Sequence, residues 1–206
     1  MIIVGIAGPT GSGKSTVCRL LSRRPGYVHV DCDLLAKRAY DPEGPAYEEV
    51  VKAFGPEVLS PDGEVDRRKL AEIVFSDPEK KRCLEEIVHP RVAQDIERIA
   101  AEEKAKGTEV LLVEGALLFS SPHTPRELFD LAIWLEAPEE VRRERLLASG
   151  LPSEAVELRI SAQRDLAPPE WVQVVDAARP VEEVVRDILS LIQDFKGKGA
   201  RDRRAP

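Results

Sequence analysis

Short apolar runs alternate along the chain with longer stretches in which apolar residues recur at helical spacing. The run Val110–Val113 is apolar at every position, which is typical of a parallel strand buried on both faces. Strands and helices that alternate in this way predict an α/β fold, with a five-stranded parallel sheet and helices on both of its faces. The predicted strands are Ile2–Ala7, Tyr27–Val30, Val110–Val113, Leu131–Leu135 and Val172–Val175.

The stretch between the second and third predicted strands is rich in helical patterns and holds no strong strand. Asp77-Pro78, for example, places a capping residue before a proline at the first helical position. The stretch is too long for a plain crossover, so we expect an inserted helical subdomain at residues 36–106 that determines substrate specificity. The helices predicted there are Lys37–Phe54, Asp66–Phe75, Asp77–Val88 and Arg91–Lys106.

Residues 8–15 read Gly-Pro-Thr-Gly-Ser-Gly-Lys-Ser, directly after the first predicted strand and before a helix-compatible run. Strand, glycine-rich loop and helix in this order indicate a P-loop, which binds a nucleoside triphosphate. Small residues let backbone N–H groups approach phosphate oxygens, and the following helix turns its positive end to the same anion. We expect Lys14 to reach the β- and γ-phosphates of ATP and the Ser15 hydroxyl to ligate Mg²⁺. The predicted nucleotide-binding residues are Gly11, Ser12, Gly13, Lys14, Ser15 and Thr16.

Carboxylates stand at the carboxyl ends of the second and third predicted strands, where ligands of open α/β sheets bind. Alternation along the strand places the Asp31 and Asp33 side chains on the same side of it. One of them would accept the proton of the phosphate acceptor, and the other would bind the water shell of Mg²⁺. Alternatively, one of them caps a helix that starts at Leu34. Glu114 either holds a metal-bound water or substrate group or is an ordinary strand-end carboxylate.

A single P-loop domain is expected over residues 1–195, with its core at 1–35, 107–137 and 166–195. A helical lid at 138–165 is crowded with arginines, of which one or two are expected to close on ATP. A basic, disordered tail is expected at 196–206. His89, before Pro90 in the insert, has the pattern of a structural hydrogen-bonding residue.

Charge and cysteine content exclude several classes of function. The net charge of −7 argues against nucleic acid as a partner. No apolar run approaches the ~20 residues of a membrane span, so no membrane partner is expected. The three cysteines, Cys18, Cys32 and Cys83, are odd in number and lack CxxC spacing, which predicts neither a disulfide framework nor a zinc site and fits a reducing cytoplasm. We expect a cytoplasmic monomer or weak homo-oligomer.

The chain resembles the dephospho-CoA kinases over most of its length. The most specific likeness lies between Gly63 and Pro90, which generic P-loop kinases lack. The residues that carry the resemblance are Gly5-Ile-Ala-Gly8, Gly11–Thr16, Val30-Asp-Cys-Asp-Leu-Leu-Ala36, Phe54-Gly55, Asp62-Gly63, Asp66-Arg67-Arg68, Val74-Phe75 and Leu84-Glu-Glu-Ile-Val-His-Pro90. The later part departs from the family pattern, because Ala116–Ser120 lacks a proline and a glutamate, Ser149-Gly150 replaces Arg-Asp, and Trp171–Ala177 lacks an asparagine.

The resemblance implies a P-loop kinase fold and transfer of the ATP γ-phosphate to the ribose 3′-hydroxyl of dephospho-CoA, the last step of coenzyme A synthesis. It also implies that Asp33 is the base, that Arg145 is the lid arginine, and that the Arg67 and His89 regions belong to the acceptor site. The expected catalytic residues are thus Asp33, Lys14 and Arg145, and the expected substrate-binding residues are Asp31, Arg67, His89 and Glu114. The alternatives are a nucleoside or nucleoside-monophosphate kinase and a nucleotide-binding regulator without transfer activity.

Overall fold

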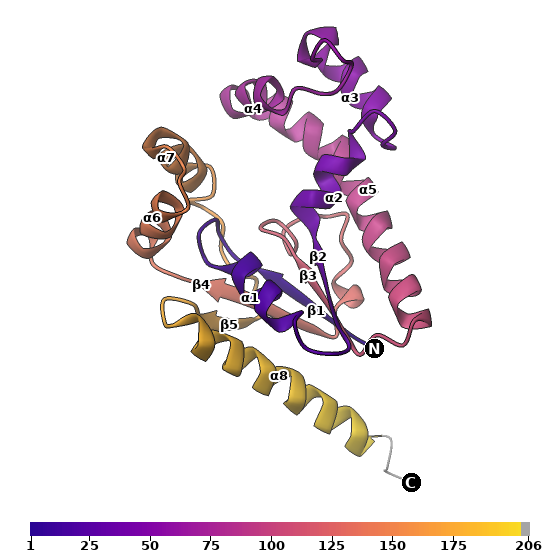
Figure 1. Ribbon diagram of the computed structural model, residues 1–206, viewed down its shortest axis with the longest axis vertical. Coiled ribbons are helices and arrows are strands. Elements are labelled where there is room, and N and C mark those ends of the chain that lie inside the picture. Colours follow the sequence, from indigo (N-terminus) through magenta and orange to yellow (C-terminus); the bar gives the residue numbers. More distant parts are fainter. Residues whose placement is uncertain (203–206) are drawn as a thin grey trace. The chain divides into compact units, whose positions relative to one another are not determined.

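The computed structural model describes residues 1–202, which contain a five-stranded parallel sheet of order β2-β3-β1-β4-β5 (Figure 1). The sequence-predicted strands are confirmed, with small differences at their ends. β1 pairs with β3 on one side and with β4 on the other, and β4 pairs with β5. The strands are β1 (Ile2–Ala7), β2 (Tyr27–Asp31), β3 (Val110–Glu114), β4 (Leu131–Glu136) and β5 (Gln173–Asp176).

Every strand except β1 ends one residue later than predicted, and each of these last residues is acidic. Glu114 pairs in register with Ile6, and Glu136 pairs with Asp176. The hydropathy pattern places the end of each predicted strand at its last apolar residue. Backbone hydrogen bonds between strands do not depend on side-chain polarity and extend one residue further. The carboxyl edge of the sheet therefore carries more carboxylates than the apolar pattern indicated.

The chain divides into two compact units, of which the first comprises residues 1–30, 103–120 and the chain from Arg126 onward. Its main core joins the sheet to α1 (Lys14–Leu21) and α8 (Val181–Asp202), which pack against each other (Figure 1). Val4 and Ile6 alternate on the core face of β1. A Cβ on the intervening Gly5 would come within 2.7 Å of the Phe119 ring, so glycine lets an aromatic cluster lie against the strand. This cluster consists of Phe119, Phe129 and Trp171.

The first unit also contains the two helices of the expected lid, α6 (Glu139–Ala148) and α7 (Ser153–Ser161). Leu146, Val156 and Ile160 form a small core between them. A short 3₁₀ turn, η2 (Arg126–Leu128), lies in the segment between β3 and β4.

The second unit comprises residues 31–102 and 121–125. Its elements are α2 (Cys32–Ala39), α3 (Tyr47–Phe54), η1 (Pro56–Val58), α4 (Arg67–Ser76) and the larger part of α5 (Pro78–Ala105). The single helix predicted at Lys37–Phe54 is wrong, because a turn with Pro42 and Pro45 separates α2 from α3. Proline removes a backbone donor and disfavours helical geometry in the residue before it.

The break predicted at His89-Pro90 is also wrong, since α5 runs through Pro90 without interruption. An interior proline costs a helix about 3 kcal/mol. Val88, Val92 and Ile96 are buried on both sides of Pro90, and this burial offsets the cost. Tertiary packing thus overrides the local helix-breaking signal.

The tail expected to be disordered is helical as far as Asp202, while residues 203–206 lie outside the described residues. Lys196 helps to hold this end of α8, because its Nζ lies 3.0 Å from Oε2 of Glu109 and over the Tyr27 ring. Among the described residues, no helix combines the length and the hydropathy that crossing a bilayer requires.

Candidate active site

The loop between β1 and α1 has the backbone geometry that its glycines predict. Gly8, Gly11 and Gly13 all have positive φ, and a Cβ on Gly11 would lie 2.7 Å from the backbone oxygen of Arg142. Gly13 is the N-cap of α1 and offers no side chain to the first amides of the helix. Free amides at a helix N-terminus and the positive end of the helix dipole are the groups that bind anions in proteins.

Lys14 lies folded over this loop. Its Nζ donates to the backbone oxygens of Gly8 at 2.8 Å and Pro9 at 3.1 Å. Both acceptors are neutral carbonyls, and a charged donor forms stronger bonds with phosphate oxygens. The lysine is therefore held at the loop in a position from which a polyphosphate can recruit it.

Two arginines of α6 contact the loop, and a third does not. Arg145 donates to the backbone oxygens of Ser12 at 3.4 Å and Ala177 at 2.8 Å, so the predicted lid arginine lies at the start of α1. Arg142 is buried and donates to the backbone oxygens of Ala137 and Thr10. Arg143 instead binds Glu139 and Glu157, which raise its pKa and tie α6 to α7.

The loop contacts of Arg142 and Gln163 are absent from the sequence prediction. Oε1 of Gln163, beyond α7, accepts a hydrogen bond of 2.6 Å from the backbone N–H of Thr10. Arg142 was one of several arginines in the lid, and no local pattern distinguished it from Arg143. Only the fold shows which side of α6 meets the loop.

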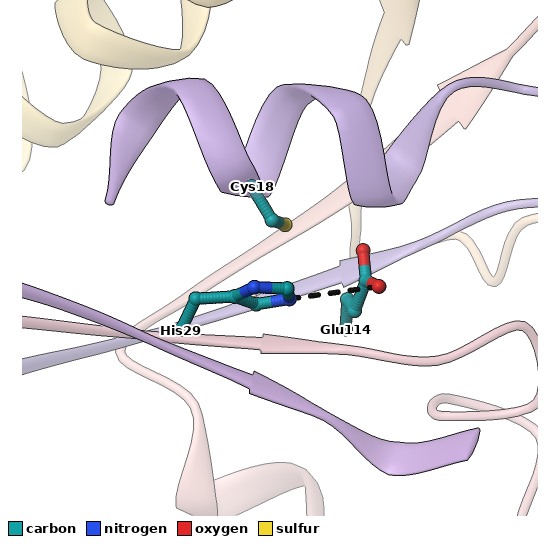
Figure 2. Close-up of side chains that lie close together, drawn as sticks. All are labelled: Cys18, His29 and Glu114. Atoms are coloured by element: carbon teal, nitrogen blue, oxygen red, sulfur yellow. Dashed lines mark ion pairs between the residues drawn. The ribbon is translucent and has the colours of Figure 1, made fainter. Parts of the chain in front are cut away.

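Glu114 lies below α1, where it meets His29 and Cys18 (Figure 2). Its Oε1 is 3.5 Å from Nε2 of His29, and its side chain is 3% exposed. Burial acts to raise the pKa of Glu114, but His29, Ser15 and Cys18 together lower it below its ordinary value. The carboxylate is therefore charged at neutral pH, and the expected metal ligand Ser15 is its neighbour.

Asp31, the last residue of β2, and Asp33 belong to the second unit and have different roles. Asp31 caps α2, because its Oδ1 accepts hydrogen bonds from the backbone N–H groups of Asp33 at 2.8 Å and Leu34 at 3.2 Å. Helix α2 starts at Cys32, so the strand alternation expected to continue to Asp33 is wrong. The capping alternative describes Asp31, while Asp33 stands in the first turn of α2.

Asp33 and Arg67 share a neighbourhood in the second unit. Burial is the main cause that raises the pKa of Tyr40; the charge of Arg67 lowers this pKa, and the charges of Asp41 and Asp33 raise it. Arg67 forms a 2.9 Å ion pair with Asp41. The base candidate Asp33 and the predicted substrate-binding residue Arg67 therefore both act on the Tyr40 phenol.

His89 lies elsewhere in the second unit, on α5. Its Nδ1 is 3.3 Å from Oγ of Ser121. Burial lowers the pKa of His89 most, His123 lowers it further, and Glu85 acts in the opposite direction. The imidazole is neutral at pH 7, as suits a hydrogen-bonding residue. Of the predicted residues, Lys14, Ser15, Glu114 and Arg145 thus meet in the first unit, whereas Asp31, Asp33, Arg67 and His89 lie in the second.

Known proteins match the chain across both units. The model of the dephospho-CoA kinase family matches residues 2–176, a span that contains all the predicted site residues. The dephospho-CoA kinase of Carboxydothermus hydrogenoformans is 36% identical over 202 residues, which cover 95% of each chain. That of Symbiobacterium thermophilum is 39% identical over 167 residues, covering 81% of this chain and 69% of the relative. A crystal structure from Thermus thermophilus is 35% identical, with a TM-score of 0.69 and coverage of 94% of this chain and 97% of its own.

Proposed function

The chain belongs to the dephospho-CoA kinase family, which uses ATP to phosphorylate dephospho-CoA in coenzyme A biosynthesis, and we propose that its acceptor atom is the ribose 3′-hydroxyl oxygen. The P-loop is the observation that supports ATP as the phosphate donor, because uncapped amides of α1 and the Lys14 ammonium converge there. The second unit supports dephospho-CoA as the acceptor, because it holds the residues most specific to the family. The products are CoA and ADP.

The P-loop binds the β- and γ-phosphates through backbone amides, and Lys14 exchanges its carbonyl partners for phosphate oxygens. Arg145 lies beside the N-cap of α1, where a guanidinium stabilises the charge that develops during transfer. Arg142 donates to the backbone oxygen of Thr10 in the loop and is a positioning residue. Catalysis by this chain is therefore chiefly placement of positive charge around the phosphoryl group.

Ser15 and Glu114 fit a magnesium ion. Both offer oxygen, which Mg²⁺ prefers, and Oε2 of Glu114 is buried without a hydrogen-bond partner. We assign the Ser15 hydroxyl as a direct ligand and Glu114 as the carboxylate that orients Ser15 and the metal-bound water. The ion supplies neutralisation of the phosphate charge during transfer.

Asp33 is proposed as the general base. The 3′-hydroxyl proton passes to an Asp33 carboxylate oxygen as the hydroxyl oxygen bonds to the γ-phosphorus, and the bond from that phosphorus to the β–γ bridging oxygen breaks. Asp31 positions the base, because it caps the turn that carries Asp33. Arg67, with Tyr40 beside it, and His89 are proposed to bind acceptor groups.

An acceptor panel tests the proposal. Purified protein with ATP and Mg²⁺ is offered dephospho-CoA, CMP, UMP or uridine, and ADP release is measured against a reaction without acceptor. We expect release above background with dephospho-CoA alone. Turnover of a nucleotide or of uridine in its place would assign another acceptor, and no turnover with any of them would indicate a nucleotide-binding protein without transfer activity.

A further inference from the structure

Three potential metal ligands from different elements converge beneath the P-loop helix. Cys18 comes from α1, His29 from β2 and Glu114 from the end of β3 (Figure 2). One ligand atom from each, Sγ, an imidazole nitrogen and a carboxylate oxygen, lies within 4.8 Å of the other two. All three residues belong to the first unit, so the cluster is part of one compact body.

The chemistry of this donor set differs from that of a magnesium site. Thiolate and imidazole are softer ligands than the oxygens that Mg²⁺ prefers, and together with one carboxylate they suit Zn²⁺. Thiolate and carboxylate bring two negative charges, which a divalent ion neutralises; this matters because Cys18 and Glu114 are almost fully buried. Three protein ligands leave the fourth tetrahedral position open to water.

Two unpaired buried atoms also support a bound cation. Nε2 of His29 and Oε2 of Glu114 are buried and have no hydrogen-bond partner, and Glu114 as a whole is only 3% exposed. The 3.5 Å from His29 to the other carboxylate oxygen exceeds the usual hydrogen-bond length. Ligands of a tetrahedral zinc ion lie about 3.5 Å apart, given bonds of about 2.0–2.3 Å. Closing the cluster onto an ion thus needs shifts of about 1 Å or less.

We propose that Cys18, His29 and Glu114 form a binding site for Zn²⁺ or a similar divalent transition-metal ion. Binding releases the Cys18 thiol proton to solvent, and a ring nitrogen of His29 ligates the ion. Because Glu114 also lies beside Ser15, an ion in this cluster withdraws the carboxylate from the magnesium site and inhibits phosphoryl transfer. This inhibition depends on the function proposed above for Glu114, whereas the binding itself does not.

Cobalt(II) spectroscopy on the full chain tests the site without an activity assay. Metal-free protein is titrated with Co²⁺, which gives a thiolate charge-transfer band in the near ultraviolet when cysteine ligates it, and then with Zn²⁺, which is expected to displace it. We expect saturation at one equivalent, loss of the band in Cys18→Ala, and its retention in Cys83→Ala. Absence of the band in the wild type, or its persistence in Cys18→Ala, overturns the proposal.

His29→Gln provides a second variant, because His29 lies on a terminal strand of the sheet and is partly exposed. Competition with a zinc-chelating dye is expected to show at least a tenfold loss of Zn²⁺ affinity, and unchanged affinity in a folded His29→Gln protein removes His29 from the site. ADP release from ATP, with dephospho-CoA as the acceptor, is measured separately with and without Zn²⁺. Normal turnover by a protein that binds no Zn²⁺ refutes the zinc site alone. Metal binding by a protein that shows no turnover even without Zn²⁺ refutes only the kinase assignment.

Discussion

Replacement of Gly11 with alanine tests the geometry of the P-loop against a matched glycine. Gly11 and Gly107 have φ values of 79° and 82°, so both positions require the left-handed backbone. An added Cβ on Gly11 would lie 2.7 Å from the Arg142 oxygen, whereas nothing lies within 4 Å of one on Gly107. Both variants bear the left-handed cost of about 1–2 kcal/mol. Only Gly11→Ala must also move the loop away from α6.

The magnitudes differ between the two variants. For a chain of this size, about 1–2 kcal/mol lowers Tm by roughly 2–8 °C, which we expect for Gly107→Ala with kcat/KM preserved. Gly11→Ala is expected to lose more stability and, because a displacement of about 1 Å misplaces the phosphate, about 10²-fold in kcat/KM. Thermal unfolding and ADP release in the presence of dephospho-CoA measure both effects. Equal Tm losses, or wild-type kcat/KM in Gly11→Ala, would refute the close contact between loop and α6.

Variants at three further positions address the second unit. Asp33→Asn is expected to lower kcat by about 10²–10⁴-fold with ATP affinity nearly unchanged; equal losses of both would make Asp33 a structural residue. Asp31→Ala removes the cap of α2 and is expected to lower the unfolding free energy by ~1 kcal/mol in urea titrations, while Asp31→Ser retains most of it; no difference between them would exclude the cap. Burial lowers the pKa of His89, so the folded state binds this proton less readily than the unfolded state. The stabilising contribution of neutral His89 is present above the unfolded pKa of about 6.5 and declines below it. The wild type is therefore expected to lose unfolding free energy between about pH 7.5 and about pH 5.5. His89→Gln is expected to lose less over the same range. Parallel pH profiles would contradict this assignment.

The features predicted best from the sequence are those encoded by neighbouring residues. The P-loop could be recognised because its glycines, Lys14 and Ser15 lie within eight consecutive positions that follow a strand and lead into a helix. The strands were found from their apolar runs, but their acidic last residues were missed because hydropathy does not register backbone pairing. Asp66 correctly marked the start of α4, since its side chain accepts from the first backbone amides of the helix.

The missed features depend on residues distant in sequence. Pro90 locally predicts a helix break. The burial of its neighbours, which offsets the cost of the proline, is a tertiary effect that the local sequence does not show. Cysteine spacing alone could not show that Cys18, His29 and Glu114 come together, because they meet only when α1 packs over neighbouring strands of the sheet. The contact of Arg142 with the P-loop likewise follows from how α6 packs, which no local pattern specifies.

The identity of the reaction product tests the central claim most directly. Protein, ATP, Mg²⁺ and dephospho-CoA are incubated, and the product is compared with authentic CoA and with its 2′-phosphate isomer by chromatography and phosphorus NMR. We predict CoA as the sole phosphorylated acceptor, formed in equal amount to ADP and lost in Asp33→Asn. A 2′-phosphate product would contradict the proposed acceptor atom, and no phosphorylated product would contradict the kinase activity itself.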